Sequence, residues 1–432
     1  MSRHLFVFLS FFILLSSSFG AFPLRGEASK TVTVSSNYAQ VVEMVNQINE
    51  TMLFDYHHGL MRFGPRYTGS LNCSFAAQYI YKCFQDMGLA VEYSNWSTEG
   101  FKSKNVVATL PGTDSDSTAY YILCGHYDTV PGAPGADDDG SGTAAVLAIA
   151  HVMSHYQFNH TIKFITFSGE EVGTYGSFTY ARDASYRGDD IVAVLNMDMI
   201  GYANSTDGGR ILRFFPPLRS HWIAEYATAI AEKYHDVIDM RIDTLPSYPG
   251  ADNQAFVDYG YDGVWIAHQD GYAWGHSAND TADHLNWTYY VKATKLMCAV
   301  TAEFAQRPLY VQVLIRQPLE GYTYVFNRPV LQTSFEKQWY SGFRGITIIF
   351  GGKTIAKADV ISEEPIKYVI FCVDGKFMVW DTEPPYEWTV QGMYFPLLGK
   401  HIIEVYAYTA SGKVASDEMD ISIWSVSRAY KG

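Results

Sequence analysis

The sequence predicts an α/β fold in which helices flank a mixed, mostly parallel sheet, followed by a small all-β sandwich domain. Up to residue 307, apolar runs of strand length alternate with segments of helical periodicity. Strands that are apolar along their whole length are typical of a sheet covered by helices on both faces. Beyond Arg307 helical periodicity becomes scarce, and strand-like runs are separated by Gly, Pro and Asp turns.

Helical and extended segments follow one another in a regular order. Two helical segments come first, at residues 37–61 and from about Ser70 to Gly88. Strands are predicted at residues 103–110, 119–128, 161–168, 191–200 and 262–268. Helices are predicted at residues 142–156, 175–184, 219–235 and 287–306. This alternation places the sheet inside and the helices outside.

The length of the chain indicates two domains, because 432 residues exceed what one ordinary core accommodates. We expect the α/β domain at residues 30–307 and the β-sandwich domain at residues 308–432. Strand-like runs of the second domain include residues 345–352, 367–375, 386–390 and 400–412.

Composition and charge argue against a disordered chain and against a nucleic-acid-binding protein. The chain is 48% hydrophobic and 18% charged, as expected for a packed globular protein rather than a disordered one. Its formal net charge of −14 at pH 7 argues against a nucleic-acid partner, which would require basic patches.

The N-terminus predicts a secretory signal peptide over residues 1–20. The apolar stretch from Leu5 to Leu15 is too short to span a bilayer. Ser18 and Gly20 are small residues placed for cleavage before Ala21. We therefore expect a secreted, extracellular protein with no membrane span after cleavage; an uncleaved anchor remains the alternative.

The five cysteines form no recognisable disulfide framework, because their number is odd and their spacings match no pattern. Cys73 and Cys83 fall on one predicted helix, where ten residues separate them by ~15 Å, too far for a bridge. We expect most of the cysteines to be buried free thiols.

Acidic and imidazole residues follow several predicted strands, at the end where α/β sheets bind ligands. Each is unremarkable alone, since such residues often cap helices, form turns or lie on the surface. Their placement after successive strands of one sheet is an unlikely coincidence. The candidates are His126, the aspartates of the run Asp137–Asp139, the pair Glu170–Glu171, Asp198 and His276.

Imidazole and carboxylate groups together favour zinc. Two zinc ions need about five protein ligands if one carboxylate bridges them, and such a pair can activate a water and stabilise a tetrahedral intermediate. One glutamate must then stay off the metal as general base. We expect Glu171 to face zinc and Glu170 to face the attacking water.

Five motifs together resemble the zinc aminopeptidases of peptidase family M28. They are "RYTGS", "GHYDTV…GADDDGSG", "SGEEVGTYGS", "NMDMIGY" and "HSANDTADHLN". They occur in the family's order, and the resemblance spans roughly residues 40 to 307. It implies a zinc-exopeptidase-like fold and removal of N-terminal residues from peptides that have a free N-terminus.

The resemblance also implies roles for single residues. It assigns His126 and Asp198 to one zinc, Glu171 and His276 to the other, and Asp138 to both. A second set is implied around the metals: Asp128 as the carboxylate that orients His126, Glu170 as general base and acid, and Tyr248 as a phenol that hydrogen-bonds the oxyanion. A cis peptide between Asp138 and Asp139 is expected as well.

The C-terminal region resembles the immunoglobulin-like domains appended to secreted archaeal and bacterial enzymes. The residues that carry this resemblance lie between Tyr368 and Ile423. We expect a structural or surface-adhesion appendage, and substrate recruitment remains the alternative.

Other functions on the same scaffold remain open at this stage. They are a carboxypeptidase, a glutaminyl cyclase that uses a single zinc, and a catalytically inactive binding domain. The presence of all five expected ligands favours the two-zinc enzyme. His284 could compete with His276 as a ligand. Substrate side-chain preference and oligomeric state stay unknown, although Met199, Tyr202, Phe256, Tyr272 and Trp274 are candidates for an apolar pocket.

Overall fold

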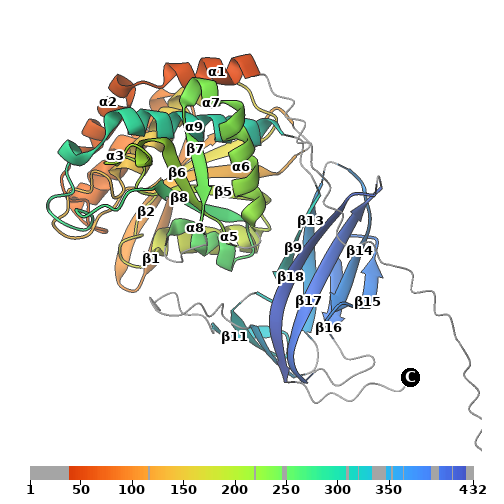
Figure 1. The fold of residues 1–432 in the computed structure, drawn as a ribbon. Coiled ribbons are helices and arrows are strands. Elements are labelled where there is room, and N and C mark those ends of the chain that lie inside the picture. Colours follow the sequence, from red (N-terminus) through yellow and green to blue (C-terminus); the bar gives the residue numbers. More distant parts are fainter. Residues whose placement is uncertain are drawn as a thin grey trace, which may run out of the picture. The chain divides into compact units, whose positions relative to one another are not determined.

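A computed structural model describes residues 38–424, apart from residues 115–116, 218–219, 246–250, 308–310, 320, 333–346, 352–353, 363, 391–397 and 411. The predicted signal peptide at residues 1–20 and the first residues of the predicted α/β domain therefore lie outside the described residues. The predicted domain boundary at residue 308 does too. Within the described part, Figure 1 shows an α/β region followed by all-β sheets, the predicted fold class.

The α/β region is built around an eight-stranded sheet with the order β1-β2-β4-β3-β5-β8-β6-β7. Its central neighbours β4, β3, β5 and β8 pair in parallel, whereas β1 and β2 pair antiparallel at one edge. The strands are β1 Ala90–Thr98, β2 Phe101–Leu110, β3 Tyr120–His126, β4 Thr161–Phe167, β5 Ile191–Met197, β6 Ile211–Phe215, β7 Arg241–Thr244 and β8 Gly263–His268. The carboxyl ends of the four central strands consequently meet at one edge of the sheet.

Helices cover both faces of this sheet, as predicted (Figure 1). Helices α5 and α8 pack together on one face, and α3, α4 and α9 are among those on the other. The helices are α1 Tyr38–Gln47, α2 Glu50–Met61, α3 Leu71–Asp86, α4 Gly140–Met153, α5 Tyr175–Arg187, α6 His221–Lys233, α7 His235–Ile238, α8 Asp252–Asp258 and α9 Trp287–Gln306. Both faces of the central strands are therefore buried.

Local side-chain caps explain where the first helices begin. The predicted helical segment at residues 37–61 is two helices, because the Asn49 side chain accepts a hydrogen bond from the Met52 amide and starts α2. Ser70 caps α3 in the same way, through the Cys73 amide. The sequence analysis placed this start correctly, since serine at an N-cap is a strong signal.

Four elements were not predicted from the sequence: the edge strands β1 and β7, the inner strand β6 and the short helix α8. Strand β1 is largely exposed and rich in polar residues, and β7 has four residues, none of them buried. Edge strands of this kind lack the apolar runs from which strands were predicted. Helix α8 has only seven residues, too few for a periodic pattern.

Replacing Gly142 with alanine is expected to destabilise the protein by about 1–3 kcal/mol or more, because the added Cβ overpacks a rigid contact. That Cβ would lie 2.2 Å from the Met197 carbonyl oxygen and 2.5 Å from the Asp139 carboxylate. Thermal unfolding measures the loss. Gly209→Ala is the control, because a Cβ there meets nothing within 4 Å. Equal melting temperatures for the two variants would contradict this packing argument.

The C-terminal region consists of two sheets around one core. The larger has the order β11-β10-β12-β18-β17-β14-β15 and the smaller β16-β13-β9. The strands are β9 Gln312–Gln317, β10 Tyr322–Val325, β11 Arg328–Gln332, β12 Thr347–Phe350, β13 Thr354–Ile361, β14 Ile366–Val373, β15 Lys376–Asp381, β16 Tyr386–Val390, β17 Leu398–Thr409 and β18 Val414–Trp424. Buried residues of both sheets, such as Ala356 of β13 and Phe371 of β14, share one hydrophobic cluster. This is the all-β region that the sequence predicted.

The five cysteines are free in the structure, as predicted, and all except the half-buried Cys83 are buried. Burial raises the pKa of thiols such as Cys73 and Cys298, which keeps them protonated and unreactive. No helix in the described part of the chain is both long and apolar enough to cross a bilayer.

Candidate metal centre

The candidate residues converge at the carboxyl edge of the central strands. His126 is the last residue of β3, Glu170 and Glu171 follow β4, and Asp198 follows β5. His276 lies on the loop after β8. The aspartate run lies between β3 and α4, so that each candidate reaches the site from a different connection.

Hydrogen bonds distinguish the three successive aspartates. Asp139 caps α4, and its carboxylate accepts the amides of Gly142 at 2.7 Å, His126 at 3.0 Å and Met199 at 3.2 Å. A carboxylate that accepts three backbone amides is committed to holding the backbone. Asp139 also lies within 4.8 Å of His126 and Asp198 as a possible ligand, but these amides already occupy both of its oxygens.

Both carboxylate oxygens of Asp137 are also occupied by partners outside the donor sets. One carboxylate oxygen accepts the Gly201 amide at 2.8 Å, and the other lies 2.9 Å from Nε2 of His268. Asp137 thus holds the Gly201 backbone and the buried His268 ring. Asp138 is the aspartate whose two oxygens are turned toward the candidate ligands.

The two oxygens of Asp138 face two different histidines. Oδ1 lies 3.3 Å from Nε2 of His126, and Oδ2 lies 3.0 Å from Nε2 of His276. On the first side, Oδ1 of Asp198 lies 3.8 Å from the same His126 nitrogen. On the second side, Oε2 of Glu171 lies 3.2 Å from the same His276 nitrogen. The donors thus form two sets that share Asp138.

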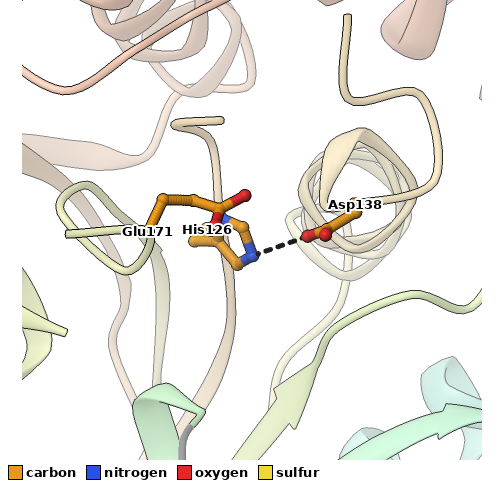
Figure 2. Close-up of side chains that lie close together, drawn as sticks. All are labelled: His126, Asp138 and Glu171. Carbon is orange, nitrogen blue, oxygen red and sulfur yellow. Dashed lines mark ion pairs between the residues drawn. The ribbon is translucent and has the colours of Figure 1, made fainter. Parts of the chain in front are cut away.

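Figure 2 shows part of this arrangement, with Asp138 facing His126 and Glu171 beside them. The ligand atoms of these three residues all lie within 4.8 Å of one another. Nitrogen and carboxylate oxygen donors at this spacing are the set that zinc prefers. The residues present therefore fit a zinc centre.

Electrostatics explain how the protein holds this acidic cluster together. Burial alone would raise the pKa of Asp138, but hydrogen bonds from His126 and His276 lower it. The hydrogen bonds that His276 donates to Asp138 and Glu171 raise its own pKa to about 11. Burial lowers the pKa of His126, yet hydrogen bonds to Asp128, Asp138 and Asp198 outweigh it and raise the pKa well above its ordinary value. His276 is therefore cationic near pH 7 when no metal is present.

Zinc binding is expected to release protons near pH 7, because His276, which is protonated there without metal, must become a neutral ligand. The apparent zinc affinity should therefore rise with pH. In metal-free protein the raised pKa of His276 contributes stability that is full below about pH 6.5 and is lost as the pH rises toward about 11. Calorimetric titration in buffers of different ionisation enthalpy counts the protons.

The exposed His58 on α2 supplies the control for this titration. His58→Gln should leave the proton count unchanged, whereas His276→Gln should lower it. A binding heat that is independent of the buffer would contradict a protonated histidine at the site.

Asp128 contacts His126, but its nearest atom differs from the one that was expected. Nδ1 of His126 lies 3.1 Å from the Asp128 carbonyl oxygen and 3.7 Å from its carboxylate. The carboxylate accepts the amides of Glu170 and Glu171, each at 3.3 Å, and the Thr68 hydroxyl at 2.6 Å. Asp128 thus also fixes the backbone of the glutamate pair.

Glu170 lies among these carboxylates, and burial raises its pKa well above the ordinary value. The positive charge of His126 opposes this rise, whereas Asp198, Asp252 and Glu171 add to it. A carboxylate with a raised pKa both takes up and returns a proton more readily near neutral pH. The environment suits the role of general base.

The remaining candidates have different outcomes. Tyr248 lies outside the described residues. His284 stacks on Trp274, with ring centroids 3.9 Å apart, whereas His276 is the histidine that contacts the carboxylates. Phe256 is not a pocket residue, because it is fully buried against Phe167 in the hydrophobic core. The expected cis peptide between Asp138 and Asp139 is present.

Arg66 is an important residue that the sequence analysis missed. Its guanidinium is fully buried and donates to the carbonyls of Tyr127 at 2.7 Å, Pro134 at 2.6 Å and Gly135 at 2.9 Å. It ties the loop between β3 and α4 to the segment before α3. The signal was visible as the first residue of "RYTGS", but its partners are backbone atoms that no sequence pattern identifies.

Asp252 was missed as well. It is fully buried at the start of α8, and burial raises the pKa of its carboxyl to about 7. The charge of His126 acts against this rise. Asp252 lies four residues after Tyr248, the only residue of this segment that was considered from the sequence.

Comparison with known sequences agrees with this geometry. Residues 105–301 match the sequence model of "Peptidase family M28". The match includes every residue of the two donor sets, so this part of the chain is similar to peptidase family M28.

Named relatives are similar over different lengths. A probable zinc metalloprotease of Pyrenophora tritici-repentis is 38% identical over 111 residues, which are 24% of this chain and 25% of that protein. The chain thus spans only about a quarter of the length of the first relatives it matches. A probable leucine aminopeptidase of Arthroderma otae is 24% identical over 320 residues, which are 69% of this chain and 84% of that protein.

Solved structures share the fold. The LapA aminopeptidase of Legionella pneumophila aligns with a TM-score of 0.56 at 21% identity, covering 63% of this chain and 76% of its own. A glutaminyl cyclase of Fimbriiglobus ruber aligns with a TM-score of 0.51 at 18% identity, covering 59% of this chain and 95% of its own. Since aminopeptidase and cyclase share this fold, the chemistry must be argued from the site.

Proposed function

We propose that this protein is a secreted two-zinc aminopeptidase that removes N-terminal residues from peptides. The observation that supports it most directly is Asp138, whose two oxygens face His126 at 3.3 Å and His276 at 3.0 Å. A carboxylate placed in this way suits a bridge between two cations. Asp198 would complete the set on the His126 side, and Glu171 the set on the His276 side.

Bound zinc would polarise the scissile carbonyl and lower the pKa of the attacking water. Glu170 takes a proton from that water as the new C–O bond forms. It then gives the proton to the nitrogen of the breaking C–N bond. The products are a free amino acid and a peptide one residue shorter. Glu170 ends the cycle ionised, ready to accept the next proton.

The charge of the site favours a substrate with a free α-amine. Bound zinc would balance the charges of Asp138, Asp198 and Glu171, but Glu170 lies outside both donor sets and remains an acidic group that attracts an amine and repels a carboxylate. Arg66 cannot bind a substrate carboxylate, because its buried guanidinium is occupied by backbone carbonyls. These features favour an aminopeptidase over a carboxypeptidase.

Two observations favour a two-metal site over the single zinc expected of a glutaminyl cyclase. His126 and Asp198 form a donor pair of their own, separate from His276 and Glu171. Asp138 contacts both histidines. A single-metal site would leave one of these pairs without a cation.

Secretion belongs to the same proposal and rests on the signal-like residues 1–20. The predicted β-sandwich domain at residues 308–432 and the α/β domain at residues 30–307 would then form the mature chain.

The test is mass spectrometry of four peptides after incubation with the purified protein, with and without a chelator. One peptide has free ends, one an acetylated N-terminus, one an amidated C-terminus, and one begins with Gln. We expect stepwise loss from free N-termini, stopped by acetylation or by chelation. Loss from the C-terminus would instead identify a carboxypeptidase, and loss of ammonia from the Gln peptide alone would identify a cyclase. If every peptide survives added zinc, the protein is a binding domain.

A further inference from the structure

A second buried aspartate holds the backbone of the aspartate run. The Asp137 amide donates to Oδ1 of Asp280 at 2.9 Å, and the Asp138 amide donates to Oδ2 at 3.1 Å. The Tyr272 hydroxyl donates to Oδ1 at 2.5 Å. The Ala136 amide donates to the Asp280 carbonyl at 3.2 Å. Three of these hydrogen bonds fix this aspartate, which is fully buried, to the loop before α4, and the fourth ties it to Tyr272.

Asp280 also belongs to the loop that carries His276, four residues earlier. Its own amide donates to the Ser277 carbonyl at 3.1 Å, which closes the chain between the two residues. The His276 side chain is 56% exposed, and its Nε2 contacts Asp138 and Glu171. The hydrogen bonds of its loop therefore help to set the position of His276 relative to Asp138.

The glutamate pair of the site is held in the same way. There Asp128 accepts two successive amides, those of Glu170 and Glu171, and one hydroxyl, that of Thr68. Each dipeptide that supplies a candidate ligand is thus held by one buried carboxylate, and each of these carboxylates accepts one hydroxyl group. The repeated pattern is difficult to explain by incidental loop packing.

We propose that Asp280, seated by the Tyr272 hydroxyl, is a positioning residue that holds Asp138 against His276. This inference rests on the metal centre proposed above and adds to it two residues outside the donor sets. Neither residue needs to touch a metal or a substrate. Asp280 acts through the backbone of Asp138, because two charge-assisted amide bonds restrict how that peptide is oriented. Residues behind metal ligands typically change metal affinity by about 10–100-fold when they are replaced.

The test compares Tyr272→Phe with Tyr81→Phe. Tyr272→Phe removes one hydroxyl and keeps the ring that packs against Tyr202 and Trp274. Tyr81→Phe removes a comparable half-buried hydroxyl, which donates to the Val91 carbonyl at 3.2 Å between α3 and β1. Asp280→Asn is the stronger variant, because its amide group would face one of the two N–H donors and leave that donor unpaired.

Three measurements separate positioning from general stability. Chelator competition gives the zinc affinity, hydrogen exchange of metal-free protein gives the protection of the Asp137 and Asp138 amides, and steady-state kinetics separates kcat from KM. We expect Tyr272→Phe to lower zinc affinity roughly 10-fold, lower kcat more than it raises KM, and speed exchange at these amides. Tyr81→Phe should change none of the three.

The outcomes are distinct. If Tyr272→Phe binds zinc and protects these amides like the wild type, the inference is wrong. If the wild type itself binds no zinc, the proposed metal centre fails instead. If Asp280→Asn does not fold, the comparison of Tyr272→Phe with Tyr81→Phe still tests the inference.

Discussion

Replacing Glu170 with glutamine is expected to lower kcat about 10³-fold while zinc stays bound. Glutamine keeps the shape of the side chain but cannot accept a proton from the attacking water. Glu170 belongs to neither of the two donor sets around Asp138, so the ligands remain in place. Steady-state kinetics on a peptide with a free N-terminus, together with metal analysis, measures both effects.

Glu43→Gln is the matched control, because it makes the same chemical change on the exposed surface of α1. Its kcat should equal that of the wild type. If Glu170→Gln keeps near-wild-type turnover, Glu170 is not the general base. If it loses zinc along with activity, Glu170 is a metal ligand, and the division of roles between Glu170 and Glu171 is wrong.

Asp138→Asn and Asp139→Asn are expected to have different defects: the first in zinc binding and the second in stability. Asp138→Asn removes the shared negative charge, so zinc content should fall from two ions to at most one and activity should fall about 10³-fold or more. Asp139→Asn places an amide group against one of the backbone donors that its carboxylate now accepts, those of Gly142, His126 and Met199. An unpaired buried donor costs about 1–3 kcal/mol, so this variant should lose stability first.

The measurements are zinc content, activity and the melting temperature of metal-free protein. Zinc content decides between them, because Asp139→Asn should melt lower but keep two zinc ions, whereas Asp138→Asn, which also loses its ion pairs with His126 and His276, should not keep both. If Asp139→Asn loses zinc while its stability is unchanged, Asp139 is the shared ligand, and the assignment based on hydrogen bonds is wrong.

The central fold could be predicted because its strands are buried on both faces. β3 and β5 are apolar along almost their whole length, and all of their residues are buried. β1 and β7 escaped prediction because edge strands keep exposed polar residues. The Asn49 cap that divides the first helical segment was also not predicted, because the helical periodicity of the sequence continues across it.

The part of the site that lies at the carboxyl ends of strands could be predicted from the sequence. Parallel strands bring His126, Glu171 and Asp198 to one edge of the sheet, and this placement does not depend on the conformation of the loops. Which of the three successive aspartates faces the histidines is settled by amide hydrogen bonds that form only in the fold. Arg66 and Asp280 were not predicted for the same reason, because their hydrogen-bond partners are backbone groups far away along the chain.

The central claim is a shared carboxylate between two metals, and anomalous diffraction from zinc-loaded crystals tests it most directly. We expect two zinc peaks about 3.5–4 Å apart, on either side of Asp138. One should lie beside His126 and Asp198, and the other beside His276 and Glu171. A single peak at full zinc loading, or a pair of peaks that Asp138 does not join, would contradict the account.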